Sequence, residues 1–297
     1  MGKKSSKPFK KAYLEITNVC NLNCSFCPKT KRSPRFVSIE EFLHLIDDVT
    51  PFTDYVYFHL MGEPLLHPNL KEFFTICGER GLKVSLTTNG TLLKEKQDIL
   101  LSSPSLYRVS ISVHSFEANQ TGQTLEEYLQ DILQFCALAS QQTKTYCVLR
   151  LWNKDNAVLK AANQRNVDIF HQVREFFHLN FDPAEALEHK PSISLCDRVY
   201  LETAEKFSWP DIQQQESFDS VFCHGLRDQF GVLVDGTVVP CCLDSEGNID
   251  LGNIYEKPLS EILSSPRAKA LYDGFSRRTP SEELCRRCGY AQRYSIL

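Results

Sequence analysis

Three closely spaced cysteines are the residues of this sequence that point most directly to chemistry. Cys20, Cys24 and Cys27 follow the pattern C-x3-C-x2-C. Three thiolates on one short loop can bind three irons of a [4Fe–4S] cluster and leave the fourth iron open, whereas four protein ligands make an electron carrier. A structural zinc site is the alternative, but zinc usually takes two close pairs of cysteines. The spacing therefore favours a catalytic cluster.

A second group of cysteines lies toward the end of the sequence. Cys223 and Cys241 follow the pattern C-x12-G-x4-C, with Gly236 between them, and Cys285 and Cys288 form a C-x2-C pair. Four thiolates complete a [4Fe–4S] site and leave no iron open, so we expect this cluster to carry an electron. A zinc ion held by the same four thiolates is the competing interpretation.

The sequence contains twelve cysteines in all. Cys77, Cys136 and Cys147 fall within apolar segments, where a cysteine behaves as a small buried hydrophobic residue, and we expect them to be structural. Cys242 is adjacent to Cys241 and leaves the choice of ligand between the two open, although only Cys241 completes the Gly-x4-Cys spacing.

About six strand-then-helix units precede the second cysteine group. Strands are expected over residues 12–17, 54–60, 82–87, 107–113, 145–151 and 192–195. Helices are expected from Ser38, which with Glu41 forms a capping box, and over 68–80, 91–101, 124–139 and 157–178. Such alternation predicts a parallel sheet flanked by helices, in the form of a partial (β/α)6 TIM-like barrel, with the active site after the carboxyl ends of the strands.

The pattern changes near residue 205. We expect a domain over 12–205 and a second region over 206–297, which begins with a linker. Phe230 to Val239 read as a hairpin with a two-residue Asp235-Gly236 turn, and residues 258–272 as a helix. This small α+β region has little apolar material, and a bound metal would help to stabilise it.

The first cysteine group resembles the radical S-adenosylmethionine (SAM) superfamily over about residues 12–196. The C-x3-C-x-aromatic-C pattern, with Phe26 as the aromatic residue, is similar to that family's signature. Met61-Gly62-Glu63-Pro64 is similar to its Gly-Gly-Glu-Pro motif. The resemblance implies a [4Fe–4S] cluster on the three cysteines, with SAM bound to it.

The same resemblance implies a set of SAM-binding residues. These are Phe26, Gly62, Glu63, Pro64, Asn89, Ser112 and Arg150. Glu63 is expected to accept hydrogen bonds from the SAM ammonium group and Arg150 to bind its carboxylate, because charged partners make the stronger hydrogen bonds. Two positions depart from the family: Met61 replaces a glycine, and His114 stands where relatives often have aspartate. His114 is therefore a candidate for substrate contact.

The second cysteine group resembles the shortened SPASM, or "twitch", domain, which carries one auxiliary [4Fe–4S] cluster. The resemblance implies reductive cleavage of SAM to a 5′-deoxyadenosyl radical, which abstracts hydrogen from an unknown substrate. The outcome is an oxidation assisted by the auxiliary cluster or, as the alternative, a redox-neutral rearrangement in which the cluster only tunes or orders the site. The substrate is a small molecule or a peptide, and the peptide reading makes the protein a maturase. An electron donor such as flavodoxin or ferredoxin is implied. A two-cluster electron carrier and a zinc-binding interaction module are the non-enzyme alternatives.

Composition limits the partners. The formal net charge is −4, from 33 basic and 37 acidic residues, which gives no reason to expect nucleic acid or a membrane surface as the main partner. The basic N-terminus lacks the apolar run of a signal peptide, and no segment approaches the length of a spanning helix. We therefore expect a cytoplasmic enzyme.

Overall fold

The computed structural model describes residues 7–118, 122–154 and 164–294. The chain forms two compact units that interleave along the sequence. Unit 1 contains the chain up to Cys20, Pro28–Val84 and the chain from Phe207, whereas unit 2 contains Asn21–Cys27 and Ser85–Lys206. The chain thus returns to unit 1 next to the expected boundary at residue 205. That boundary, as a division between functional domains, stays a prediction.

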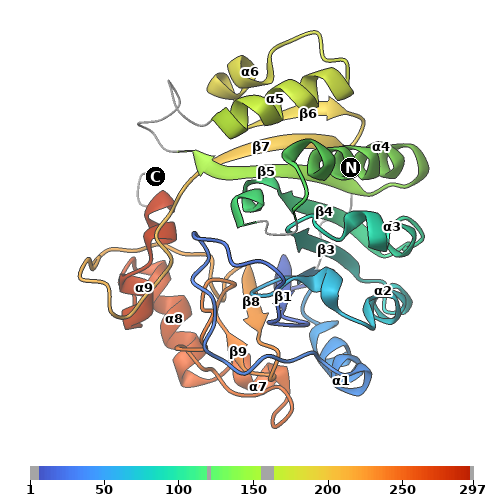
Figure 1. The fold of residues 1–297 in the computed structure, drawn as a ribbon. Coiled ribbons are helices and arrows are strands. Elements are labelled where there is room, and N and C mark those ends of the chain that lie inside the picture. Colours follow the sequence, from blue (N-terminus) through green and yellow to red (C-terminus); the bar gives the residue numbers. More distant parts are fainter. Residues whose placement is uncertain (1–6, 119–121, 155–163, 295–297) are drawn as a thin grey trace. The chain divides into compact units, whose positions relative to one another are not determined.

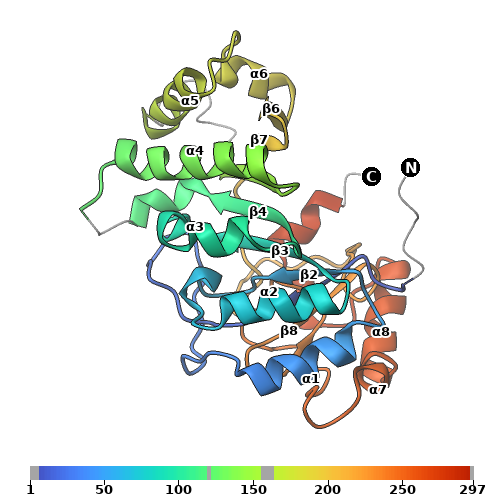
Figure 2. The same ribbon diagram turned by 90° about the vertical axis from the view of Figure 1, so that its right-hand side faces the viewer.

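Unit 1 contains strands near both ends of the chain. Its elements are β1 (Lys11–Leu14), α1 (Ile39–Val49), β2 (Tyr55–Phe58), η1 (Pro64–Leu66), α2 (Leu70–Glu79), the start of β3 (Lys83–Thr88), β8 (Gln229–Val232), β9 (Val238–Val239), α7 (Leu259–Leu263), α8 (Pro266–Ser276), α9 (Glu283–Arg286) and η3 (Gly289–Tyr294). β1 lies between β2 and β8 and is parallel to both, and β9 is antiparallel to β8. Figure 2 shows α1 and α2 side by side.

Unit 2 continues the alternation of strand and helix (Figure 1). Its elements are the end of β3, α3 (Leu93–Leu101), β4 (Leu106–Ser112), η2 (Val113–Ala118), α4 (Leu125–Gln142), β5 (Tyr146–Lys154), α5 (Gln164–Phe176), α6 (Pro183–His189), β6 (Ser192–Cys196) and β7 (Val199–Glu205). β5 lies between β4 and β7 and is parallel to both. The mixed α/β class with a parallel sheet is confirmed.

The two faces of the β4–β5–β7 sheet differ in polarity. Alternate residues of each strand are fully buried, as Val109, Leu149 and Leu201 are. The residues between them form what we call the polar face, which consists of Arg108, Ser110, Ser112, Tyr146, Arg150, Tyr200 and Glu202 together with the apolar Val148. The interior of a complete TIM barrel is filled with branched aliphatic side chains. The polar face is instead suited to a solvated ligand.

The last expected strand of the parallel sheet was assigned to the wrong segment. Residues 192–196 do form a strand, β6, but it runs antiparallel to β7. The parallel partner of β5 is β7, which the sequence analysis missed. Its pattern is mixed rather than strongly apolar, since only one face of the strand is buried. The residues 157–163 of the expected helix 157–178 lie outside the described residues.

The C-terminal turn and helix also differ from expectation. Asp235-Gly236 does not form a two-residue turn: Leu233 donates its N–H to the carbonyl of Thr237 at 2.9 Å, and Gly236 has φ +90°. This is a three-residue hairpin loop with glycine in the left-handed region. The expected helix 258–272 is two helices, because Pro266 starts α8 with Ser265 as its N-cap.

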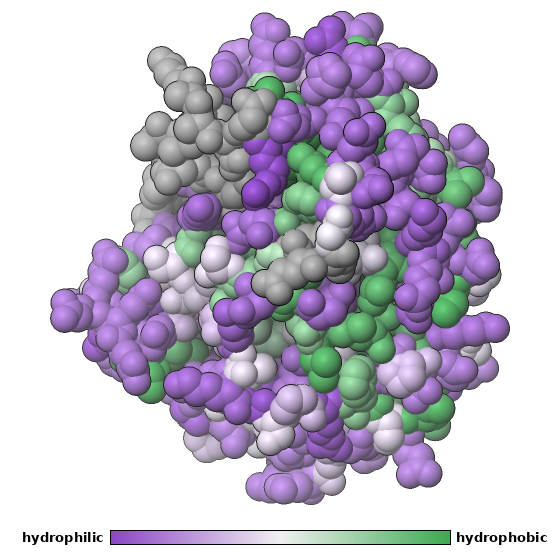
Figure 3. All heavy atoms as spheres, in the orientation of Figure 1, coloured by the Kyte–Doolittle hydropathy of each residue, from purple (hydrophilic) through white to green (hydrophobic). Residues whose placement is uncertain are grey.

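The expected cap of α1 is present, and the surface is mostly hydrophilic. Ser38 and Glu41 form the expected capping box at α1. Hydrophilic side chains cover most of the face drawn in Figure 3, with hydrophobic ones scattered among them. Among the described residues, no helix has the length and apolar character needed to cross a membrane.

Candidate active site

The first cysteine group directly follows the first strand region. Cys20 is exposed, Cys24 is buried and Cys27 is half-buried. Cys20 ends a segment of unit 1, whereas Cys24 and Cys27 belong to unit 2. In unit 2 the thiol of Cys24 lies 4.0 Å from the backbone carbonyl of Ser115 in η2. The loop therefore rests on the segment that follows β4.

Further contacts hold this loop against η2. Ser25 donates to the carboxylate of Glu117 from its N–H at 3.2 Å and from its hydroxyl at 2.5 Å. The rings of Phe26 and His114 have their centroids 4.6 Å apart. His114 Nδ1 lies 3.0 Å from the carbonyl of Arg150, and burial lowers the pKa of His114 to about 4. A neutral His114 thus supports the loop, and its contact with a substrate stays a prediction.

Asn89 braces the beginning of the same loop. Its Nδ2 donates to Oδ1 of Asn21 at 2.8 Å, and its Oδ1 accepts from the hydroxyl of Thr91 at 2.7 Å. The backbone carbonyl of Asn89 accepts from the hydroxyls of Tyr128 at 2.6 Å and Ser115 at 3.2 Å. The expected SAM-binding residue is therefore fixed on both its side chain and its backbone.

Ser112 and Arg150 lie side by side. They are direct partners in the register of β4 and β5 and belong to the polar face, with Ser112 at the end of β4 and Arg150 in the middle of β5. The guanidinium carbon of Arg150 lies 3.4 Å from the ring centroid of Trp152. A guanidinium held in this way is oriented for a planar anion such as a carboxylate. The register thus brings together two of the expected SAM-binding residues.

Only glycine fits at residue 62. Gly62 has φ +78°, and a Cβ there would lie 2.4 Å from the carbonyl oxygen of Thr17 and 2.9 Å from that of Val19. Substitution would therefore push the Met61–Pro64 loop away from the strand that leads to Cys20. The motif glycine has a steric reason that is independent of any ligand.

Glu63 is buried and partly engaged. Its side chain is among the buried polar groups, with 1% of the residue exposed. Its backbone N–H donates to the carbonyl of Val19 at 2.8 Å, and its Oε1 accepts from the N–H of Leu65 at 3.0 Å, which caps η1 at Pro64. A carboxylate has about four acceptor positions, and the N–H of Leu65 occupies one of them.

The second cysteine group comes together within unit 1. Burial raises the pKa of the Cys223 thiol to about 11, and it raises the pKa values of Cys241, Cys285 and Cys288 as well. After burial, the nearby thiols of Cys242, Cys223, Cys288 and Cys285 raise the pKa of Cys241 further. Segments far apart in the sequence thus place all four expected ligands in one half-buried to buried group.

Cys242 lies near the other cysteines of this group and also contacts Tyr13. Burial raises the pKa of Tyr13, and the next cause is the thiol of Cys242, which shares a hydrogen bond with the tyrosine hydroxyl. Cys242 also packs against the small core formed by Tyr13, Leu60, Leu233 and Val239. This packing favours Cys241 over Cys242 as the ligand, an assignment that stays a prediction.

The donor set fits an iron–sulfur cluster. Thiolates are the ligands of such clusters, and metal charge would keep these buried thiols deprotonated. Within the described residues, no three histidine, cysteine or acidic side chains are close enough to hold a single metal ion. Each thiolate of a four-iron cluster binds its own iron, so its ligands are spaced more widely than those of one ion.

Two residues that the sequence analysis missed lie at the centre of unit 1. Glu15 follows β1, and Arg32 follows the first cysteine group. They form a buried ion pair with two N–O distances of 2.7 Å. The available signal was a glutamate within the expected strand 12–17, close to Cys20. Asn21 was missed because it lies between two cysteines.

Two families match the chain. Residues 14–150 match the Radical SAM superfamily, and residues 223–289 match SPASM, an iron-sulfur cluster-binding domain. The chain therefore contains a radical SAM domain and a C-terminal SPASM domain. These two domains imply SAM and two [4Fe–4S] clusters as cofactors, which confirms the expected family and cofactors.

Curated relatives differ in how much of the chain they match. A GTP 3′,8-cyclase of Aquifex aeolicus is 25% identical over 290 residues, which cover 86% of this chain and 88% of the relative. A tungsten-containing aldehyde ferredoxin oxidoreductase cofactor-modifying protein of Pyrococcus furiosus is 35% identical over 88 residues. That second match spans only 28% of this chain and 25% of the relative.

Solved structures share the fold at low sequence identity. BtrN in complex with AdoMet and 2-DOIA has a TM-score of 0.55 at 18% identity, over 96% of this chain and 94% of that chain. Streptococcus suis SuiB bound to precursor peptide SuiA has a TM-score of 0.62 at 16% identity, over 96% of this chain and 71% of that chain. These likenesses concern the fold alone.

Proposed function

We propose that the protein cleaves SAM reductively and uses the resulting 5′-deoxyadenosyl radical to oxidise a substrate. Cys20, Cys24 and Cys27 would hold the cluster, which would supply the electron for splitting SAM into methionine and this radical, and the radical would take a hydrogen atom from a substrate C–H bond. The substrate radical then loses one electron to the auxiliary cluster and one proton to solvent, so the net change is a two-electron oxidation. A reduced flavodoxin or ferredoxin provides the first electron.

The observation that carries this proposal is the grouping of four thiols in unit 1, of which Cys288 is buried and the other three are half-buried. Cys241 lies among Cys223, Cys285 and Cys288. A site with four protein ligands has no open iron for a substrate, so its chemical use is electron transfer. Cys241 is the proposed ligand, because Cys242 is engaged with Tyr13.

SAM binding is proposed for the motif residues. Glu63 accepts from the ammonium group, and Ser112 with Arg150 binds the carboxylate. Asn89, braced by Asn21 and Thr91, holds the cluster loop in place and contacts SAM. The buried position of Glu63 and the adjacent register of Ser112 and Arg150 support these roles.

The polar face of β4, β5 and β7 is the proposed substrate wall. It contains a pocket of about 240 Å³ lined by Tyr107, Arg108, Tyr146, Val148, Ser192, Tyr200 and Glu202. Arg108 and Glu202 pair at 3.4 Å, a long contact between two partly exposed side chains. Such a pair contributes little to stability, so it can exchange its contact for hydrogen bonds to a ligand.

A peptide substrate is the second candidate. The structure of SuiB bound to its precursor peptide covers 96% of this chain, and this likeness of fold supports the peptide alternative. The small-molecule reading draws equal support from BtrN in complex with 2-DOIA. The two readings share every step up to hydrogen abstraction and differ only in what occupies the polar face.

The test is an anaerobic assay with dithionite and candidate substrates deuterated at carbon. We expect 5′-deoxyadenosine to form and to carry deuterium when the true substrate is present. Glu202→Gln should reduce the substrate-dependent rate and leave the slow substrate-independent formation of 5′-deoxyadenosine unchanged. Protein that contains both clusters but makes no 5′-deoxyadenosine would overturn the proposal.

A further inference from the structure

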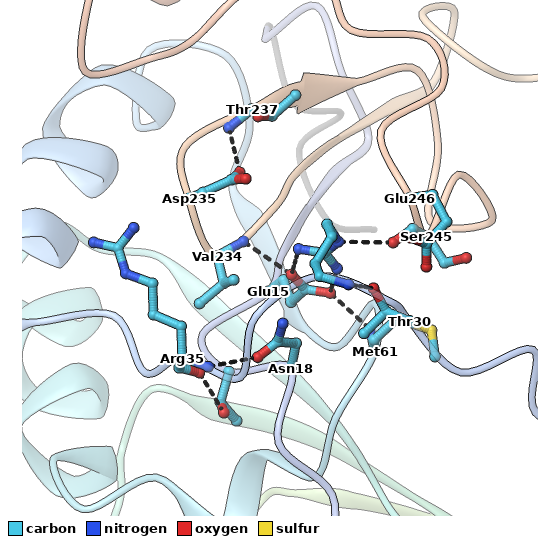
Figure 4. Close-up of polar contacts among 12 residues, drawn as sticks. Glu15, Asn18, Thr30, Arg35, Met61, Val234, Asp235, Thr237, Ser245 and Glu246 are labelled. Atoms are coloured by element: carbon cyan, nitrogen blue, oxygen red, sulfur yellow. Dashed lines mark hydrogen bonds and ion pairs between the residues drawn. The ribbon is translucent and has the colours of Figure 1, made fainter.

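The carboxylate of Glu15 accepts four hydrogen bonds within unit 1 (Figure 4). Arg32 donates from Nη1 to Oε2 and from Nη2 to Oε1, each at 2.7 Å. The backbone N–H of Met61 donates to Oε1 at 3.2 Å, and that of Val234 donates to Oε2 at 2.9 Å. The side chain of Glu15 is fully buried, and its four acceptor positions are all used.

These partners belong to separate functional segments. Met61 begins the loop that carries Glu63, and Val234 lies in the turn between β8 and β9 of the SPASM region. Arg32 extends the connection, because its Nε donates to the carbonyl of Ser245 at 3.0 Å. One buried ion pair therefore joins the proposed SAM-binding loop to two segments of the auxiliary-cluster domain.

A second contact also links the segment after the first cysteine group to the SPASM region. The backbone N–H of Lys31 donates to the carboxylate of Glu246 at 3.1 and 3.3 Å. Close by, the buried carboxylate of Asp244 accepts from the backbone N–H groups of Asn248 and Ile249 at 2.9 and 2.8 Å, so the loop that receives Arg32 is itself ordered. The segment after the first cysteine group is thus fastened to a fixed part of the SPASM region.

We propose that Glu15 and Arg32 are positioning residues through which the auxiliary-cluster domain sets the geometry of the Met61–Pro64 loop. Glu15 fixes Met61, and the steric limit at Gly62 passes this constraint on to Glu63. Removal of the ion pair lets the loop move away from β1, and the SAM ammonium group loses its aligned acceptor. This inference rests on the proposed function, in that Glu63 binds SAM.

The alternative is a buried ion pair that serves stability alone. Such a pair would affect the unfolding midpoint and leave the affinity of folded protein for SAM unchanged. A positioning role instead separates the two quantities, so SAM affinity is the deciding readout. A useful control is the two-bond ion pair in which Arg267 donates from Nε and Nη2 to the carboxylate of Glu282, each at 2.8 Å, in a different part of unit 1.

The test compares Glu15→Gln, Arg32→Lys and Arg267→Lys as anaerobically reconstituted protein. Glu15→Gln turns an amide N–H₂ toward the guanidinium, and Arg32→Lys keeps the charge but loses the fork. We expect both to bind SAM roughly ten- to hundredfold more weakly, as losses of supporting contacts behind ligand groups do. Iron content should stay at that of the unmodified protein, and the rate at saturating SAM should change less than the KM for SAM. Arg267→Lys should bind SAM normally.

Glu63→Gln, measured in parallel, distinguishes failure of the positioning role from failure of the proposed SAM site. If Glu63→Gln weakens SAM binding and folded Arg32→Lys and Glu15→Gln do not, the positioning role is wrong and the proposed function stands. If Glu63→Gln itself binds SAM normally, the proposed SAM site is wrong. If Glu15→Gln does not fold, Arg32→Lys alone decides, and normal SAM affinity in that variant contradicts the inference.

Discussion

The two cysteine groups differ in how their ligands are spaced along the sequence. The three thiols of the first group lie within eight consecutive residues, and one loop that follows the first strand carries all of them. The four expected ligands of the second group come from segments that lie tens of residues apart, and the fold of unit 1 gathers them. A local loop can leave one iron open for chemistry, whereas ligands supplied from all sides enclose the cluster. The spacing of the cysteines along the sequence therefore predicts which group forms a catalytic cluster and which forms an electron carrier.

The largest effect is expected from removal of the first group. Cys20→Ala, Cys24→Ala and Cys27→Ala together should abolish formation of 5′-deoxyadenosine and lower the iron content from about eight to about four per chain. Iron analysis and chromatography of the reaction measure both. Unchanged iron, or stoichiometric zinc in place of iron, would show that the first group does not hold a cluster.

Single substitutions at adjacent cysteines sharpen the definition of the second group. Cys241→Ala should lose about half of the iron, because three thiolates of the auxiliary site would remain without their fourth. Cys242→Ala is the matched control and should retain the iron, since its thiol packs on Tyr13. The opposite result in the same iron assay would exchange the two roles.

A smaller effect is expected at the SAM loop. Glu63→Gln should weaken SAM binding by roughly ten- to hundredfold, because a hydrogen bond to a charged group contributes about 1.5–3 kcal/mol. Glu79→Gln, an exposed acid at the end of α2, is the control and should bind SAM normally. Equilibrium binding under anaerobic conditions gives both affinities, and equal values would remove Glu63 from the site.

The smallest effect is a pH dependence to which His114 contributes beside His67, because burial lowers the pKa of both to about 4. Burial holds the pKa of His114 at about 4, below its usual value of 6.5. At His114 the unfolded chain therefore binds a proton that the folded protein does not, and the contribution of His114 to stability should fall as the pH drops from about 6.5 toward 4, by at most on the order of 3 kcal/mol. Urea unfolding at pH 7.5 and 5.5 measures it. His114→Gln should reduce the slope, whereas exposed His171→Gln should not; equal slopes in all three proteins would contradict the assignment.

Prediction from sequence succeeded where chemistry or periodicity is local. The capping box at Ser38, the alternation of strands and helices and the first cysteine loop all depend on neighbours within a few residues. β7 was missed because its orientation depends on pairing with β5 rather than on its own pattern. Glu15 and Arg32 were missed for the same reason, since their contacts join residues up to 219 positions apart.

We propose that the first cluster serves SAM cleavage and that the auxiliary cluster accepts an electron from the substrate. One double variant distinguishes these two functions. Cys285→Ala with Cys288→Ala, shown to be folded by circular dichroism and limited proteolysis, is assayed anaerobically for 5′-deoxyadenosine and for oxidised product. We expect the double variant to continue to form 5′-deoxyadenosine and not to form oxidised product. A folded double variant that makes product at the normal rate, or one that no longer cleaves SAM, would contradict the account.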